Sequence, residues 1–195
     1  MPSHHPFTTT QFEENIARTT RQIRNEMNAL AAELENGEPR LVYWIKPHQL
    51  ACTVRPLRRH PRYAGGRVRL PAETRGLVDG WIADVIKEGI RSVLSLMHDA
   101  DLDCYSSLGF EGDLLDEIQA CGLGVARCPY EDPHYKSSSA QEKLGTLLLV
   151  REEALRKFIE LPKPVLIMCS SGIDRSAPVA AFILESTQGT EYADG

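Results

Sequence analysis

Three stretches of the chain repeat one pattern, in which an amphipathic segment of helical period is followed by a short apolar run. The segments and their runs are residues 75–89 and 91–97, residues 111–122 and 124–130, and residues 138–161 and 164–169. The runs are apolar at consecutive positions, so both faces of each strand must be buried, which is typical of parallel sheets covered by helices. The pattern therefore predicts an α/β fold with a central, largely parallel sheet flanked by helices.

The chain before these units has a different organisation. Residues 11–36 place apolar side chains three and four positions apart, which predicts an amphipathic helix. Two short β-rich runs follow at 41–45 and 50–54. We therefore divide the chain into an N-terminal helical extension, residues 1–40, and a main domain, residues 41–195. The apolar stripe of the helix either packs on this domain or contacts a partner or a second copy of the chain.

The charge of the chain limits its partners. A formal net charge of −5 argues against a general binder of nucleic acid or of anionic membranes, because such surfaces need an excess of Lys and Arg. One segment departs from this balance by gathering six arginines: Arg55, Arg58, Arg59, Arg62, Arg67 and Arg69. This arginine cluster is either an ordinary solvated surface or a contribution to binding an anionic substrate.

The sequence shows few features that would direct the chain to a membrane or that are typical of disulfide-bonded proteins. The N-terminus has no apolar signal core, and no run approaches the ~18 apolar residues that span a bilayer. The five cysteines form no CxxC pair, which makes a zinc site or a disulfide framework a poor interpretation. We expect a cytoplasmic protein with reduced thiols and no membrane span.

The most informative position is Cys169, at the end of the last apolar run. Open α/β sheets place their active sites at the carboxyl ends of their strands. The loop after Cys169 leads into a predicted helix at 175–187, and the N-terminus of a helix favours bound anions and thiolates. Cys169 is thus a candidate nucleophile, and the alternative is an inert buried cysteine followed by a solvated arginine.

The residues after Cys169 suit a phosphate group. Arg175 carries a planar fork that holds two phosphate oxygens at once. Ser170, Ser171 and Gly172 are small enough for successive backbone N–H groups to turn inward around an anion. Gly172 can also adopt a backbone conformation that other residues resist.

The stretch MCSSGIDRS, residues 168–176, resembles the signature loop HCxxGxxR[ST] of the cysteine-dependent protein tyrosine phosphatases, and most closely that of the dual-specificity branch. AFIL at 181–184, WIKPHQLACTVRP at 44–56 and WIADVIKEGIRSVLSLM at 81–97 are similar to further segments of that branch. The resemblance covers about residues 41–190. It implies a phosphotyrosine protein phosphatase-like fold, with residues 41–195 as the catalytic domain.

The resemblance also implies roles for individual residues. Cys169 would attack phosphorus to form a phosphocysteine, Arg175 would bind the phosphoryl group, and Ser176 would ease departure of the thiolate in the second step. The loop that holds the phosphate would consist of Ser170, Ser171, Gly172, Ile173, Asp174 and Arg175. No metal or cofactor is implied.

A general acid must protonate the leaving oxygen. The family carries an aspartate for this on a loop after the preceding strand, and Asp132 follows the run at 124–130. Glu131 is the alternative, and both side chains could instead cap the next helix. His134 and Tyr135 either line the mouth of the site or lie in a solvated loop.

The sequence departs from the family pattern in two places. Met168 stands where the family has a histidine that supports the loop, and a thioether donates no hydrogen bond. The chain also extends only about 20 residues beyond Arg175, where relatives add helices. A reversible disulfide between Cys169 and another cysteine is a further possibility that some relatives suggest. The candidates are Cys104, Cys121 and Cys128.

The function implied is hydrolysis of phosphate monoesters, on phosphotyrosine, on phosphoserine or phosphothreonine, or on a small phosphomonoester. Two alternatives remain open. One is a pseudophosphatase that binds phosphorylated partners without turnover. The other is a phosphatase for non-protein substrates such as phosphoinositides or RNA 5′ ends, with no other nucleic-acid partner expected.

Overall fold

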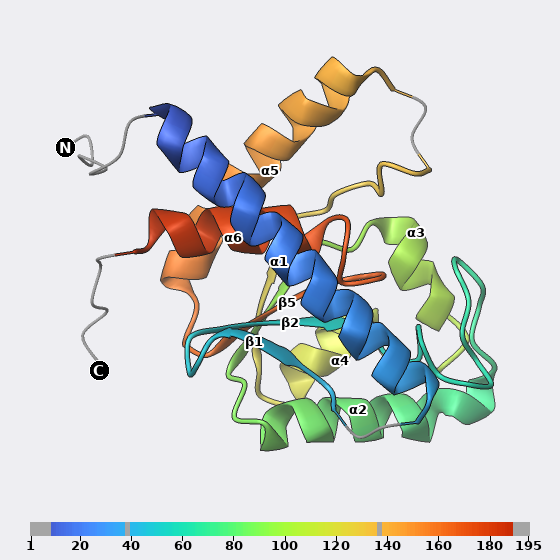
Figure 1. The fold of residues 1–195 in the computed structure, drawn as a ribbon. Coiled ribbons are helices and arrows are strands. Elements are labelled where there is room, and N and C mark those ends of the chain that lie inside the picture. The colour runs from blue at the N-terminus through green and yellow to red at the C-terminus, as the bar shows by residue number, and fades with distance from the viewer. Residues whose placement is uncertain (1–8, 38–39, 136–137, 189–195) are drawn as a thin grey trace.

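The computed structural model describes residues 9–37, 40–135 and 138–188, and it contains a five-stranded sheet flanked by helices (Figure 1). The strands are β1 (Tyr43–Lys46), β2 (Leu50–Val54), β3 (Ser92–Ser95), β4 (Gly124–Arg127) and β5 (Val165–Cys169). Their order is β1-β2-β5-β3-β4, with β1 antiparallel to β2 and the other pairs parallel. The predicted α/β class and the largely parallel sheet are confirmed.

The helices agree with the three predicted helix–strand units, and one short helix was not predicted. They are α1 (Thr9–Glu35), α2 (Arg75–Lys87), α3 (Asp99–Leu102), α4 (Leu114–Ala120), α5 (Ala140–Glu160) and α6 (Ser176–Ser186). The unpredicted helix is α3, a single turn that begins four residues after the end of β3. In the part of the chain that the structure describes, no helix is both long and apolar enough to cross a membrane.

The sheet separates two apolar layers, and β5 contributes to both. Val165, Ile167 and Cys169 belong to the layer built with α1, α5 and α6, whereas Leu166 and Met168 belong to the layer built with α2 and α4. This alternation follows from the two-residue period of a strand. It explains why the run at 164–169 is apolar at every position.

Helix α1 packs along α6 on one face of the sheet (Figure 1). Its side chains Ile23, Met27 and Leu30 are buried in the same core as β5. Thr19 Oγ1 donates a hydrogen bond of 2.6 Å to Glu185 Oε1, which ties α1 to the C-terminal end of α6. The apolar stripe of α1 is therefore covered by its own chain, and it is not available for the contact with a partner or second copy that the sequence left open.

Candidate active site

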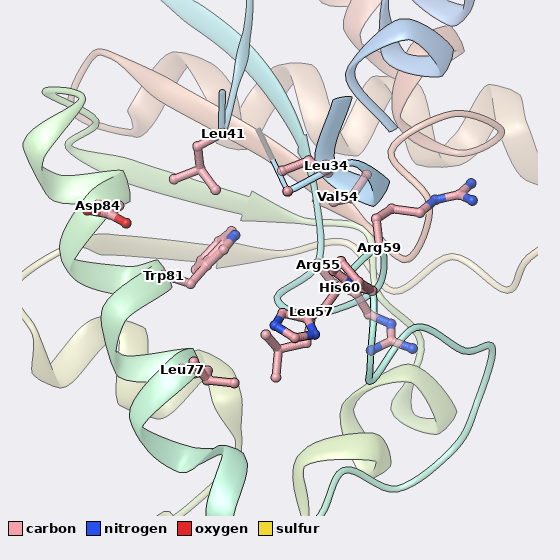
Figure 2. A pocket seen from close by; sticks show the side chains of 12 residues that line it. Leu34, Leu41, Val54, Arg55, Leu57, Arg59, His60, Leu77, Trp81 and Asp84 are labelled. Carbon is pink, nitrogen blue, oxygen red and sulfur yellow. The ribbon is translucent and has the colours of Figure 1, made fainter. Parts of the chain in front are cut away.

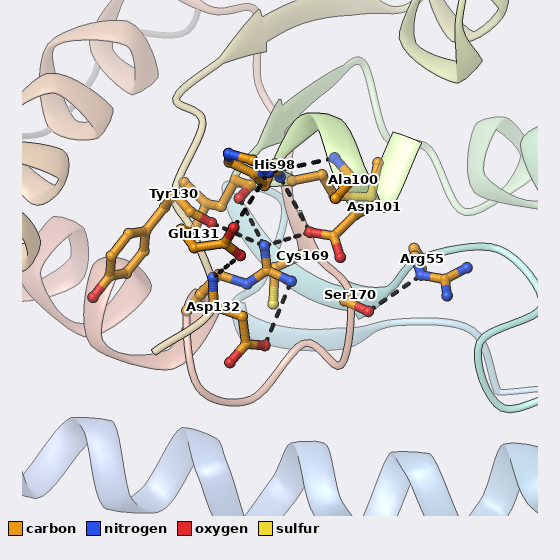
Figure 3. Close-up of polar contacts among 12 residues, drawn as sticks. Arg55, His98, Ala100, Asp101, Tyr130, Glu131, Asp132, Cys169 and Ser170 are labelled. Atoms are coloured by element: carbon orange, nitrogen blue, oxygen red, sulfur yellow. Dashed lines mark hydrogen bonds and ion pairs between the residues drawn. The ribbon is translucent and has the colours of Figure 1, made fainter. Parts of the chain in front are cut away.

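The predicted phosphate loop at 170–175, together with Cys169, begins at the carboxyl end of the central strand β5 and leads into α6 (Figure 3); residues 169–175 are called the phosphate-binding loop after this prediction. The loop turns back on the thiol, since the N–H of Gly172 donates to Cys169 Sγ at 3.1 Å. Cys169 itself has no exposed surface. The structure thus places the predicted nucleophile at the base of a loop whose backbone already contacts its sulfur.

Gly172 has the backbone conformation that the sequence suggested, with a φ of +74°. A Cβ at this position would lie 2.5 Å from Met27 Cε and 2.8 Å from the carbonyl oxygen of Thr53. The loop is therefore pressed between α1 and the end of β2, and only glycine fits without a shift of backbone.

We expect Gly172→Ala to lower the free energy of unfolding by at least about 2 kcal/mol, because strain and the clash with the Thr53 carbonyl add. It should also weaken binding of inorganic phosphate. Gly89→Ala is the matched control, since Gly89 has a φ of +82° but open space around its Cα. Urea unfolding and phosphate titration of both variants test this. An equal loss of unfolding free energy in the two variants would contradict the close packing of the loop.

Arg175 is fully buried, and only one end of its guanidinium is anchored. Its Nη1 donates to Asp101 Oδ2 at 2.6 Å and to the carbonyl oxygens of Tyr130 at 2.9 Å and Leu96 at 3.4 Å. Its Nε and Nη2 are buried and have no hydrogen-bond partner among the described residues. Buried donors without acceptors are rare and costly, so the two nitrogens mark a place where an acceptor is expected.

Asp101 is the functional residue that the sequence reasoning missed. Its side chain is buried, lies on α3 and forms an ion pair with Arg175. Burial alone would raise the pKa of this carboxyl group, but the hydrogen bond and charge of Arg175 outweigh burial and lower it. Burial likewise opposes ionisation of Arg175, and Cys169 and Asp101 raise its pKa overall. The pair is therefore charged at neutral pH.

Asp132 lies near Nη2 of Arg175, at the end of the guanidinium that has no hydrogen bond to the described residues. Its Oδ2 is 3.7 Å from Nη2 of Arg175, and its Oδ1 accepts the N–H of His134 at 3.0 Å. The structure thus places the predicted general acid close to Nη2, one of the two Arg175 nitrogens without a hydrogen bond in the described part of the chain. Neither Asp132 nor Glu131 caps α5, because Ser139 does so through the N–H of Glu142.

Glu131, the alternative acid, is occupied elsewhere. It forms an ion pair with Arg67, its Oε2 lies 3.5 Å from Nδ1 of His98, and its Oε1 accepts the N–H of Asp132. The contact with Arg67 lowers the pKa of Glu131 despite partial burial. Glu131 therefore supports the backbone of Asp132. Of these two candidate acids, Asp132 is the one that lies next to Arg175.

His134 and Tyr135 follow Asp132 in the chain and contact neighbouring segments. His134 Nε2 lies 3.5 Å from Asp174 Oδ2, which places His134 beside the phosphate-binding loop. Tyr135 is 57% exposed, and the guanidinium of Arg67 lies 4.3 Å from the centre of its ring. Both side chains are thus exposed, which fits both sequence interpretations, the mouth of the site and a solvated loop.

The remaining loop residues have distinct surroundings. Ser171 Oγ accepts the N–H of Ile173 at 3.4 Å, and Ile173 packs against the core. Ser170 Oγ accepts a hydrogen bond from Arg55 at 3.2 Å. Ser176 Oγ is buried at the start of α6 and has no hydrogen-bond partner among the described residues. Like Nε and Nη2 of Arg175, this hydroxyl is therefore a buried polar group without a hydrogen bond to the described residues.

The arginine cluster is not one exposed basic surface. Arg55 is buried, and three other members each form an ion pair with a carboxylate on a different element. These pairs are Arg59–Glu35, Arg67–Asp101 and Arg69–Asp103. Most of the charge in this segment thus holds the segment against the rest of the domain.

The cysteines are all free thiols. Cys104 and Cys128 are buried, and burial raises the pKa of Cys128 to about 11. Cys52 lies one strand from Cys169 and two residues back in register. Such diagonal neighbours are about 7–8 Å apart, at or beyond the limit of about 7 Å for a disulfide.

A pocket of about 390 Å³ lies next to the candidate active site, between α2 and the segment after β2 (Figure 2). Its walls are mainly apolar and include Trp81, Leu41 and Leu57. Arg55 borders this pocket and also contacts Ser170, so this residue joins the wall of the pocket to the phosphate-binding loop.

Comparisons with protein-family models, curated proteins and solved structures found no match to this chain. The assignment of a function therefore depends on the motif and on the geometry of the site.

Proposed function

We propose that this chain is a cysteine-dependent phosphatase that hydrolyses phosphate monoesters, with phosphotyrosine and phosphoserine or phosphothreonine as the substrate class. The observation that carries the proposal is the arrangement of Arg175. Its Nη1 is fixed by Asp101 while Nε and Nη2 are buried without acceptors, at the N-terminus of α6 and close to Cys169. Two oxygens of a phosphoryl group would satisfy these nitrogens.

In the first step the thiolate of Cys169 attacks phosphorus, a P–S bond forms and the P–O bond to the leaving group breaks. Arg175 and the backbone N–H groups of the loop stabilise the charge on the phosphoryl oxygens. Asp132, 3.7 Å from Arg175, donates its proton to the departing oxygen.

In the second step water attacks the phosphocysteine and the P–S bond breaks. The Asp132 carboxylate takes the proton from the water, and inorganic phosphate and the thiolate are released. The Ser176 hydroxyl, which is buried without a partner, is suited to hydrogen-bond the departing sulfur.

Hydrolysis of p-nitrophenyl phosphate in the presence of EDTA tests the proposal. We expect turnover without added metal, and acid quenching during turnover should trap one phosphate on the chain, located at Cys169 by mass spectrometry. Absence of both turnover and phosphate binding would refute the proposal.

A second candidate function is favoured by Met168. Its side chain packs in the layer of α2 and α4, on the other face of the sheet from Cys169, and supplies no hydrogen bond to the loop. A loop without that support can hold a phosphorylated partner with little turnover. Phosphate binding with no hydrolysis and no trapped phosphocysteine would establish this pseudophosphatase.

Asp132→Asn is expected to reduce kcat by about 10²–10⁴-fold on phenyl phosphate, because the phenolate leaving group needs a proton. The loss should be much smaller on p-nitrophenyl phosphate, whose leaving group departs readily as an anion. Glu131→Gln is the matched control and should show no dependence on the leaving group. Steady-state rates on the two esters measure the difference. An equal loss on both esters would remove Asp132 from the role of general acid.

A further inference from the structure

Arg55 is a second buried arginine at the phosphate-binding loop, where it contacts Ser170 (Figure 3). Arg55 is the residue directly after β2, and it is only 2% exposed. The backbone N–H of Arg55 donates to the carbonyl oxygens of Cys169 at 3.1 Å and Ser170 at 3.4 Å. Its Nε donates to Ser170 Oγ at 3.2 Å. Both the main chain and the side chain of Arg55 thus hold the first two residues of the loop.

The rest of the guanidinium is fixed by neutral acceptors. Nη1 donates to the hydroxyl of Tyr105 at 3.1 Å, and Nη2 donates to the carbonyl oxygens of Gly65 and Gly66. The Tyr105 hydroxyl in turn donates to the carbonyl oxygen of Pro56 at 2.7 Å. All three nitrogens are occupied, so the side chain has one defined orientation.

In the described part of the chain, Arg55 has no carboxylate partner, unlike Arg175 and three other members of the arginine cluster. Within the described residues, Arg59, Arg67, Arg69 and Arg175 each form an ion pair, whereas none joins Arg55 to Asp or Glu. Burial alone would lower the pKa of Arg55, but Tyr105, Cys104 and the charge of Asp101 raise it, so the guanidinium stays charged. A buried cation without a direct ion pair is unfavourable, and an anion bound nearby relieves that cost.

The two buried guanidiniums at the loop have different partners. Arg175 pairs with Asp101 and lies 3.7 Å from Asp132, whereas the hydrogen bonds of Arg55 go to neutral groups. The buried positive charge of Arg55 therefore lies beside the loop without an ion pair to any described residue. Met168 offers no such charge, whereas Arg55 is a buried cation that contacts the first two residues of the loop.

We propose that Arg55 is a positioning residue for the proposed phosphatase activity: it fixes Cys169 and Ser170 at the start of the phosphate-binding loop and supplies buried positive charge that strengthens phosphate binding. This inference rests on the proposed function. It adds a residue outside the signature loop, 115 positions from Ser170, as a determinant of that loop.

The test compares Arg55→Met, which removes the charge and the hydrogen bonds, with Arg55→Lys, which keeps the charge. Arg69→Met is the matched control, because Arg69 is an exposed arginine of the same segment that pairs with Asp103. Each change is made in the full chain and in a Cys169→Ser background. The measurements are kcat and KM for p-nitrophenyl phosphate, the dissociation constant for inorganic phosphate, and the melting temperature.

We expect Arg55→Met to weaken phosphate binding by about 10- to 100-fold, as for loss of a hydrogen-bonding charged group, and to lower kcat/KM by at least as much. Arg55→Lys should recover most of the phosphate affinity while kcat remains reduced, since lysine keeps the charge without the fork. Arg69→Met should stay within about twofold of the parent, as exposed ion pairs contribute little.

Two results would overturn the inference. One is a folded Arg55→Met with kcat/KM and phosphate affinity within twofold of the parent, and the other is an equal loss of affinity in the Met and Lys variants. If Arg55→Met does not fold, Tyr105→Phe removes the acceptor of Nη1, and unchanged phosphate affinity and kcat in that variant would also overturn it. Failure of the proposed function is distinct, since the parent chain itself would then show no turnover while the phosphate titrations still test Arg55.

Discussion

Replacing Cys169 with serine is expected to lower hydrolysis of p-nitrophenyl phosphate by at least about 10⁴-fold, because a serine hydroxyl ionises far less readily than a thiol and is a weaker nucleophile. Inorganic phosphate should still bind. The anchored Arg175 and the backbone of the loop do not depend on the sulfur, apart from the hydrogen bond from Gly172 that an oxygen can also accept. Initial rates and a phosphate titration measure the two effects.

Cys121→Ser is the control for this prediction, since Cys121 is an exposed thiol at the end of α4. It should retain full activity. Hydrolysis by Cys169→Ser at the rate of the parent chain would show that another group is the nucleophile. Loss of both turnover and phosphate binding would instead mean that the serine disturbs the loop, and melting temperatures would then separate misfolding from loss of chemistry.

The sequence was sufficient for the elements whose pattern is local. The helices at 75–89 and 138–161 and the run at 164–169 have a period or an apolar composition that is complete within each segment, and each is present in the structure within a few residues of its predicted ends. The position of Cys169 followed from the same local signal, because it ends a buried strand. Gly172 was identified in the same way, from its place in a tight loop.

The contacts that hold the site were not predictable in this way. Asp101 is 74 residues from Arg175, and its helix α3 is too short to show a helical period. The available signal was three aspartates directly after an apolar strand, at the edge where parallel strands place functional groups. Arg55 was noticed only as a member of the arginine cluster. Its burial depends on Tyr105 and on the order of the strands, neither of which the sequence specifies.

Asp101→Ala is expected to destabilise the fold by about 3–5 kcal/mol, because it leaves the buried guanidinium of Arg175 without its carboxylate partner. It should also lower kcat/KM, since Arg175 loses the hydrogen bond from Nη1 to Asp101 that orients Nε and Nη2. Asp103→Ala is the matched control, because Asp103 is an exposed aspartate two residues away that pairs with Arg69. Urea unfolding and steady-state rates report both effects, and equal stability of the two variants would contradict the role of the buried pair.

The same pair makes stability depend on pH in a defined direction. The pKa of Asp101 is lower in the folded chain than the ordinary value of an aspartate, about 3.9, so the unfolded chain takes up this proton first as the pH falls. The stabilisation is complete above the unfolded pKa and is lost as the pH falls through the folded pKa. Asp101→Asn should therefore flatten the decline of unfolding free energy below about pH 4. The decline that remains would come from other carboxyl groups with lowered pKa values, such as Glu131, because their pairs are unchanged. An acid decline as steep in Asp101→Asn as in the parent chain would show that the Asp101 carboxylate is not the group through which Arg175 stabilises the fold.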